Sequence, residues 1–247
     1  MRLDVTLSKI RVEWLRTLLG MCAGFLSFVL TCAAAELPHA DRAKLNILVL
    51  GDSLAAGYGL DPAEAFPALL QEKVNARGWA HKVVNAGLSG DTTAGGVRRL
   101  DWLLKQRVDI LILELGGNDG LRGIQPETTR SNLVNIIRRA RERYPELQVV
   151  MAGMRMPPNL GAAYVERFQN IFPEVAKENG AKLVPFLLEG VGGSRELNQA
   201  DQIHPTARGQ EVVAENVWRV LEPLLNPGGD GNASPSPIAD RGAGKGQ

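Results

Sequence analysis

Hydrophobic residues gather in five short, uninterrupted runs, and amphipathic stretches separate them. Runs that are apolar at successive positions indicate strands buried on both faces of a sheet. These predicted strands cover residues 45–50, 82–85, 109–114, 148–152 and 182–185. Strands of this kind belong in a parallel sheet rather than in an antiparallel sheet with one face in water.

The stretches between the runs have the spacing of amphipathic helices. They predict helices over residues 62–77, 94–106, 126–143 and 161–179, and a last helix after Pro205. In that last stretch Val213, Val217 and Leu221 fall on one helical face. Alternating strands and helices predict an α/β fold, a three-layer α/β/α sandwich around a mostly five-stranded parallel sheet. No repeat or internal linker divides this region, so we expect one domain over residues 36–225.

The N-terminal segment has the order of a secretory signal peptide. Basic residues precede an apolar run at positions 18–30, and the small residues Ala33 and Ala35 precede Glu36. We expect export to the periplasm or secretion, with removal of residues 1–35. Two alternatives remain: residues 17–35 could span a membrane uncleaved, or Cys32 could carry a lipid anchor. Cleavage would remove both cysteines, Cys22 and Cys32.

The C-terminal segment, residues 226–247, is rich in glycine, proline and serine and lacks apolar periodicity. This composition predicts a disordered tail.

Composition and charge exclude several classes of function. The chain has 247 residues and a formal net charge of +1, which lacks the basic excess that nucleic-acid binding requires. The three histidines and two cysteines show no metal-ligand spacing. We therefore expect no metal and no cofactor, and a small-molecule substrate rather than a nucleic acid.

Three polar, glycine-flanked turns follow the first three predicted strands. They contain Ser53, the sequence Ser89-Gly90-Asp91, and Asn118. Ligands of open α/β sheets bind beyond the carboxyl ends of the strands, so these turns should meet at one functional edge.

Each candidate residue also has a structural interpretation when taken alone. Ser53 could cap a helix, the sequence from Asn118 to Gly120 could be an ordinary turn, and His204 could be a solvated residue before a helix. Together they favour catalysis, because acyl transfer needs a nucleophile, a base, a group that orients the base, and oxyanion donors. Ser53 supplies a hydroxyl, and an imidazole titrates near neutrality. Asp201 stands three residues before His204.

Four sequence blocks resemble the signatures of the SGNH (GDSL) hydrolases, and especially their bacterial thioesterase, lysophospholipase and arylesterase branch. The blocks are "GDSL", "SGDTT", "GGND" and "DQIHP", in that order, and the third lies in "LILELGGNDGLRG". The resemblance covers roughly residues 45–225 and implies the flavodoxin-like fold of that family. A lipase-type Gly-x-Ser-x-Gly elbow is excluded, because position 55 is alanine.

The resemblance implies a role for each matching residue. Ser53 would be the nucleophile, His204 the base and Asp201 the residue that orients it. The oxyanion donors would be the backbone amides of Ser53 and Gly90 and the side chain of Asn118. Gly87 also lies in the second block, but Gly90 has the aligned Ser-Gly-Asp context.

The same resemblance implies a serine esterase that acts on aryl and acyl esters, acyl thioesters and lysophospholipids. The loop 119–125 is expected to cover the acyl pocket, and the segment after the fourth strand to form another wall. The expected substrate-binding residues are Asp119, Gly120, Leu121, Met156 and Pro157. Alternatives are a carbohydrate O-acetylesterase of the same fold and a non-catalytic acyl- or lipid-binding protein. We expect a monomer or a weak oligomer.

Overall fold

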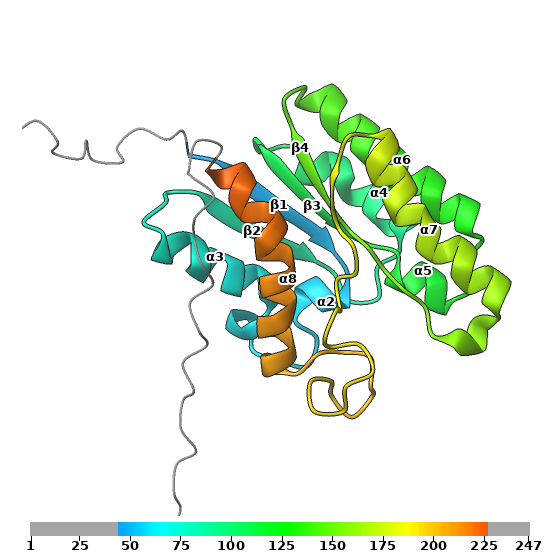
Figure 1. Ribbon diagram of the computed structural model, residues 1–247. Helices are drawn as coiled ribbons and strands as arrows, with labels where there is room; N and C mark the ends of the chain where they lie inside the picture. The colour runs from blue at the N-terminus through cyan, green and yellow to red at the C-terminus, as the bar shows by residue number, and fades with distance from the viewer. Residues whose placement is uncertain (1–43, 227–247) are drawn as a thin grey trace, which may run out of the picture. The chain divides into compact units, whose positions relative to one another are not determined.

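A five-stranded parallel sheet forms the centre of the computed structural model, which describes residues 44–226 (Figure 1). All neighbouring strands pair in parallel, in the order β2-β1-β3-β4-β5. The strands are β1 (Asn46–Gly51), β2 (Lys82–Gly87), β3 (Ile110–Glu114), β4 (Gln148–Ala152) and β5 (Lys182–Val184). The five predicted strands are confirmed, and their ends differ from the predicted ones by no more than two residues.

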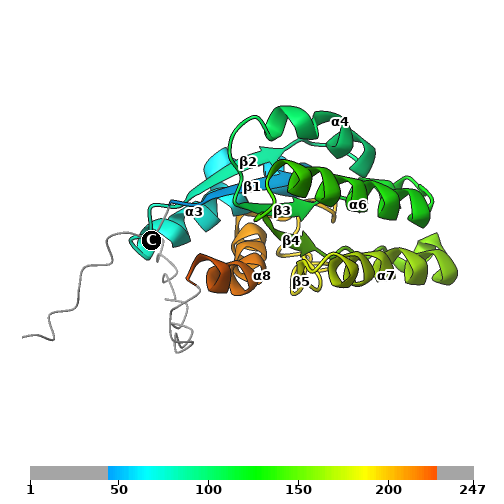
Figure 2. The ribbon, with the colours of Figure 1, turned by 90° about the horizontal axis from the view of Figure 1, so that it is seen from above.

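Helices cover both faces of this sheet, as a parallel sheet requires. Helices α3 (Phe66–Ala76) and α8 (Ala207–Leu225) lie on one face (Figure 2). Helices α4 (Thr93–Leu103), α6 (Pro126–Arg143) and α7 (Ala162–Glu178) lie on the other (Figure 2). The predicted three-layer sandwich is therefore confirmed.

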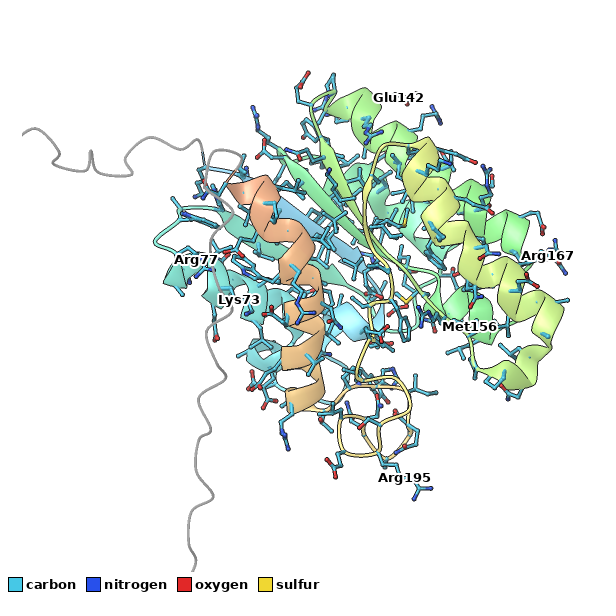
Figure 3. All side chains as sticks on the ribbon, viewed as in Figure 1. Lys73, Arg77, Glu142, Met156, Arg167 and Arg195 are labelled. Atoms are coloured by element: carbon cyan, nitrogen blue, oxygen red, sulfur yellow. The ribbon has the colours of Figure 1, made fainter. Side chains whose placement is uncertain are left out.

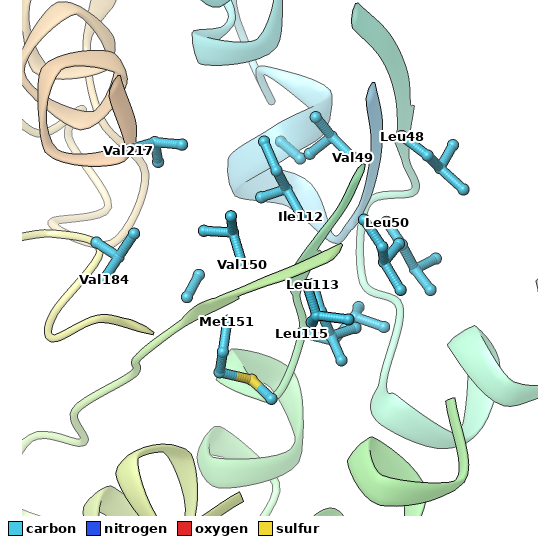
Figure 4. Close-up of a cluster of buried hydrophobic side chains, with 14 of the residues drawn as sticks. Leu48, Val49, Leu50, Ile112, Leu113, Leu115, Val150, Met151, Val184 and Val217 are labelled. Carbon is cyan, nitrogen blue, oxygen red and sulfur yellow. The ribbon is translucent and has the colours of Figure 1, made fainter. Parts of the chain in front are cut away.

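The core consists of aliphatic side chains that alternate between the two faces of the sheet. Val49, Ile112 and Val150 are register neighbours on β1, β3 and β4 and point toward the side of Val217 on α8 (Figure 4). Leu113 and Met151 point to the opposite side (Figure 4). All five residues of β3 are buried, so the strand before the third predicted turn lies wholly in the core.

Ion pairs join α3 to α8 at the surface of the first helical layer. Lys73 of α3 pairs with Glu215, and Arg77, the residue after α3, pairs with Glu222; Figure 3 labels both cations. Exposed pairs of this kind contribute at most about 1 kcal/mol each, so the buried apolar faces hold the helices in place.

Several local elements differ from the prediction. The helix expected over residues 62–77 is broken at Ala65 into a 3₁₀ helix, η1 (Pro62–Glu64), and α3. Asp61 and Glu64 form a reciprocal capping box that closes this short turn before α3 begins.

Two short helices, α2 (Ser53–Ala56) and α5 (Gly117–Leu121), occupy the first and third predicted turns, and η2 (Pro158–Leu160) precedes α7. The expected loop 119–125 therefore begins inside a helix.

The predicted leader, both of its cysteines, and the predicted C-terminal tail beyond Asn226 lie outside the described residues. Among residues 44–226, no helix combines the length and apolar character that a membrane crossing needs.

Candidate active site

Ser53 stands at the carboxyl end of β1, where it is the first residue of α2. The helix cap is Asp52, whose Oδ1 accepts a hydrogen bond from the backbone amide of Leu54 at 3.0 Å. The alternative in which Ser53 caps the helix is therefore wrong. Asp52 satisfies the helix amide, and the Ser53 hydroxyl is directed to another partner.

That partner is His204. Ser53 Oγ lies 3.0 Å from His204 Nε2, and His204 Nδ1 lies 2.6 Å from Asp201 Oδ2. With its Nδ1–H donating to the carboxylate, the imidazole keeps Nε2 as an acceptor for the serine proton. The structure thus brings Ser53 together with a histidine that lies 151 positions later in the sequence and with the aspartate three positions before that histidine.

Two backbone amides hold the Asp201 carboxylate in place beside the imidazole. Its Oδ1 accepts hydrogen bonds from the backbone amides of His204, at 3.0 Å, and Ile203, at 2.9 Å. These bonds and the imidazole contact lower the pKa of Asp201 to about 2, chiefly through the amide of His204. The carboxylate is therefore ionised at any pH near neutrality.

The loop that carries His204 is closed at its base and tied to the segment after α2. Asn198 and Pro205 form an antiparallel bridge, and Gln199 Nε2 donates to the carbonyl oxygen of Tyr58 at 2.7 Å. The Tyr58 ring packs against the His204 ring, with centroids 4.5 Å apart. These contacts hold the imidazole above Ser53.

Gly90 lies in a tight turn after β2. The amide of Asp91 donates to the carbonyl of Leu88 at 3.0 Å, which makes Gly90 the third residue of the turn. Its φ of 78° is the positive value that type II turns need at that position, where glycine is favoured. Arg122, next to α5, donates to the Gly90 carbonyl at 2.9 Å and so ties this turn to the helix of Asn118.

Gly87 has a different task. It is the last residue of β2, and a side chain there would lie 2.7 Å from the carbonyl carbon of Ala55 in α2. The glycine lets the helix of Ser53 approach the sheet closely. This contact explains the first glycine of the block and leaves Gly90 as the glycine of the turn.

Asn118 is the second residue of α5, and its side chain is held from the β1 side. Its Nδ2 donates to Asp52 Oδ2 at 3.1 Å. One amide hydrogen is thereby directed to Asp52, and the second amide hydrogen remains for another acceptor. Asp52 therefore connects the helix of the nucleophile to the helix of Asn118.

Of the five residues expected to contact substrate, two are buried and three are at least partly exposed. Asp119 is buried and accepts hydrogen bonds from the backbone and hydroxyl of Thr93 and from the hydroxyl of Thr129, so its carboxylate supports α5 from within. Gly120 is also buried, and a side-chain carbon there would meet the side chain of Met156. Leu121 and Pro157 are exposed, and Met156 is half-buried.

A pair of buried carboxyl groups lies beneath Ser53, and the sequence analysis did not identify it. Glu114, the last residue of β3, is fully buried, and its Oε2 accepts from the backbone amide of Asp52 at 3.0 Å. Burial raises the pKa of Asp52 to about 6, and burial and the Asp52 charge raise the pKa of Glu114 well above its ordinary value. The sequence signal for Glu114 was an acidic residue at the end of an otherwise apolar strand.

Arg99 on α4 was also missed. Its guanidinium donates to the carbonyls of Gly51, at 2.8 Å, and Ala86, at 2.5 Å, and to Asp91 Oδ2 at 2.7 Å. One side chain thus joins the carboxyl ends of β1 and β2 to the turn of Gly90. Arg99 lies inside α4 and outside the four sequence blocks, so the sequence gave no signal for its role.

Within residues 44–226, no three His, Cys, Asp or Glu side chains are grouped as a metal site would require. This grouping does not test activity, so the expectation that hydrolysis needs no metal stays a prediction.

A serine beside an imidazole and a carboxylate, at the carboxyl edge of a parallel sheet, defines the class: a serine hydrolase of the α/β type. The family model described as the GDSL-like Lipase/Acylhydrolase family matches residues 49–212. The chain belongs to that family, as the four sequence blocks indicated, and it is a carboxylic ester hydrolase.

Named relatives agree with this assignment. The chain is 43% identical over 195 residues to Esterase TesA of Pseudomonas aeruginosa, covering 78% of this chain and 96% of the relative. It is 42% identical over 184 residues to Thioesterase 1/protease 1/lysophospholipase L1 of Escherichia coli, covering 73% and 85%. Among solved structures, psychrotrophic esterase EstA from Pseudoalteromonas sp. is similar, with a TM-score of 0.69 and 32% identity over 73% of this chain and 98% of the other.

Proposed function

We propose that this protein hydrolyses aryl esters, acyl esters and acyl thioesters through an acyl-enzyme formed on Ser53. The single observation that carries the proposal is the relay of contacts from Ser53 Oγ to His204 Nε2, at 3.0 Å, and from His204 Nδ1 to Asp201, at 2.6 Å. Ester and thioester substrates also fit the names of the two curated relatives, an esterase and a thioesterase.

In the proposed reaction His204 Nε2 takes the serine proton as Oγ attacks the carbonyl carbon. The tetrahedral oxyanion is stabilised by the backbone amides of Ser53 and Gly90 and by Asn118 Nδ2. Ser53 is suited to this donation, because the first amides of a helix have no acceptor within the helix. His204 then gives the proton to the departing alcohol or thiol, and later activates the water that releases the acid.

The apolar rim of the site supports an apolar acyl or aryl group. In the described part of the chain, five large hydrophobic side chains are exposed, and four of them adjoin the site: Tyr58, Leu88, Leu121 and Ile203. Tyr58 packs on His204, Leu88 begins the turn of Gly90, Leu121 ends the helix of Asn118, and Ile203 precedes His204. An apolar rim with few polar groups favours lipid-like esters over acetylated sugars.

The test uses p-nitrophenyl esters of increasing chain length, an acyl thioester and an acetylated sugar. We expect turnover of the first two classes and weak turnover of the sugar. Ser53→Ala and His204→Ala should each lower kcat by several orders of magnitude, with the circular dichroism spectrum retained. A folded Ser53→Ala variant with near wild-type turnover would show that the nucleophile is wrong, and preference for the sugar would favour the O-acetylesterase alternative.

We further propose that the protein is exported and cleaved before Glu36, on the basis of the basic, apolar and small-residue order of its first 35 positions. N-terminal sequencing of the protein from a producing cell should begin at Glu36. An acylated Cys32, or an intact leader in the membrane fraction, would contradict cleavage.

A further inference from the structure

The two carboxyl groups beneath Ser53 lie in an environment where they cannot both be ionised. Asp52 is 1% exposed and Glu114 is 0% exposed, and they lie on adjacent strand ends. Two negative charges at close range without water repel each other strongly, so such a pair holds one proton. The question is which group carries it.

The hydrogen bonds around the pair answer this question. Both Asp52 oxygens accept hydrogen bonds, Oδ1 from Leu54 N and Oδ2 from Asn118 Nδ2. Glu114 Oε2 accepts from Asp52 N, whereas Glu114 Oε1 is buried and has no partner among the described residues. A carboxyl oxygen buried without a donor is costly, but it is satisfied when it carries a proton itself.

We propose that Glu114 is a positioning residue that stays protonated at neutral pH and donates its proton to the Asp52 carboxylate, which in turn fixes the side-chain amide of Asn118 for the oxyanion. This proposal rests on the proposed reaction, in which Asn118 is an oxyanion donor. An ionised Asp52 has only acceptors to offer, so Asn118 must turn its NH₂ group, and not its carbonyl, toward this corner. The neutral Glu114 allows Asp52 to keep its charge in a buried place.

The pKa of each carboxyl group is raised, as expected for a pair that shares one proton. Burial is the largest cause that raises the pKa of Glu114, and the charge of Asp52 is the second. The amides of Asp52 and Ala55 oppose these effects on Glu114. Burial raises the pKa of Asp52 to about 6, and the Leu54 amide and Asn118 oppose that effect. The other charged groups near Asp52 are His204, which lowers its pKa, and Asp91, which raises it; Arg99 contacts Asp91 and the carbonyl of Gly51.

A spectroscopic test reads the proton directly and does not depend on activity. The full protein is labelled with ¹³C at glutamate side-chain carboxyls in one sample and at aspartate carboxyls in another. Infrared spectra at pH 7 should show a protonated carboxyl band in the glutamate sample that Glu114→Gln removes and Glu142→Gln, at an exposed position of α6, does not. A protonated band only in the aspartate sample, or none in either, would overturn the proposal.

A kinetic test reads the effect on Asn118. Glu114→Gln keeps a neutral donor of the same shape and should hold kcat within about tenfold of wild type. Glu114→Leu removes the donor and should lower kcat by ~10²-fold, with KM nearly unchanged. An oxyanion donor stabilises the transition state and not the bound substrate, so its misorientation lowers kcat alone. Circular dichroism and a melting curve check that the leucine variant is folded.

The outcomes separate this proposal from the proposed function. Equal kcat values for the folded Gln and Leu variants would overturn the role of Glu114 while leaving Ser53 as the nucleophile. If the leucine variant does not fold, the infrared bands of the wild type and of Glu114→Gln still show whether Glu114 carries the proton. If the wild type hydrolyses no ester, the proposed function fails, and the same bands report on the shared proton alone.

Discussion

At the scale of single residues, the reactivity of Ser53 depends on groups that are distant in the chain. His204 receives its proton, Asp201 sets the tautomer of the imidazole, and Asp52 caps the helix so that the hydroxyl does not have to. Asp52 also binds the Asn118 amide, so one carboxylate serves both the nucleophile and the oxyanion donor. A change at any of these positions should therefore alter kcat more than KM.

Asn118 gives the clearest prediction at this scale. Losing one oxyanion donor costs about 3–4 kcal/mol, or roughly 10²–10³ in kcat, so Asn118→Ala should fall in that range. Asn118→Asp should be worse, since it places a third carboxyl group against Asp52 and repels the oxyanion. Both variants are measured with one aryl ester. An aspartate variant that is more active than the alanine variant would contradict the oxyanion role, because aspartate suits an ordinary turn.

Asp201 gives a prediction about pH. Its pKa is about 2 in the folded protein and 3.8 as a free side chain. The folded pKa is depressed, so Asp201 contributes stability that is present above its unfolded pKa and is lost as the pH falls through about 2. Urea unfolding should show Asp201→Asn destabilised at pH 6 and nearly equal to wild type at pH 2.

The control for this experiment is Glu142→Gln, which also removes one exposed carboxylate but lies on α6. A gap between wild type and Asp201→Asn that stayed constant from pH 6 to pH 2 would show that the hydrogen bonds to Asp201 do not depend on its charge. Loss of activity above pH 4 must in any case come from a group other than Asp201, which remains ionised there.

At the scale of elements, long periodic segments were predictable and short ones were not. The helix α6 (Pro126–Arg143) begins and ends at the predicted residues, because eighteen residues give several turns of apolar periodicity. The helices α2 and α5 have only four and five residues, too few for a periodic pattern. The Asp52 cap supports α2, and hydrogen bonds to Asp52 and Thr93 hold α5; a local pattern does not contain these contacts.

Gly87 tests how closely α2 must approach the sheet. Gly87→Ala would place a methyl group against the backbone of Ala55 and Ala56, which cannot give way as a side chain can. We expect a displaced α2 and a loss of kcat of at least about tenfold, since small misplacements of a nucleophile are costly. Ester hydrolysis and a melting curve are measured together.

Gly78→Ala is the control, because Gly78 has no neighbouring atom within 4 Å of the added methyl; unlike Gly87, it has a positive φ, which strains the alanine variant. It should lower stability by about 1 kcal/mol without lowering kcat. Equal kcat values for the two alanine variants would show that close packing at Gly87 does not position Ser53.

At the scale of the molecule, the order of strands was enough to predict where the site would be. Parallel strands end at the same edge, and the turns of Ser53, Gly90 and Asn118 do follow neighbouring strands of the order β2-β1-β3. The directions of single side chains were not predictable in this way. Asp119 points into the fold toward Thr93, and Glu114 ends a buried strand beneath Asp52, because contacts 26 and 62 residues away decide both.

The central claim is that Ser53 is a nucleophile made reactive by His204. The most direct measurement reacts the protein with a fluorophosphonate and locates the adduct by peptide mass spectrometry. We predict one rapid modification, on the peptide that contains Ser53, which is absent in Ser53→Ala and slowed by orders of magnitude in His204→Ala. A stoichiometric adduct on a different residue, or labelling of Ser53 at an unchanged rate in His204→Ala, would contradict the account.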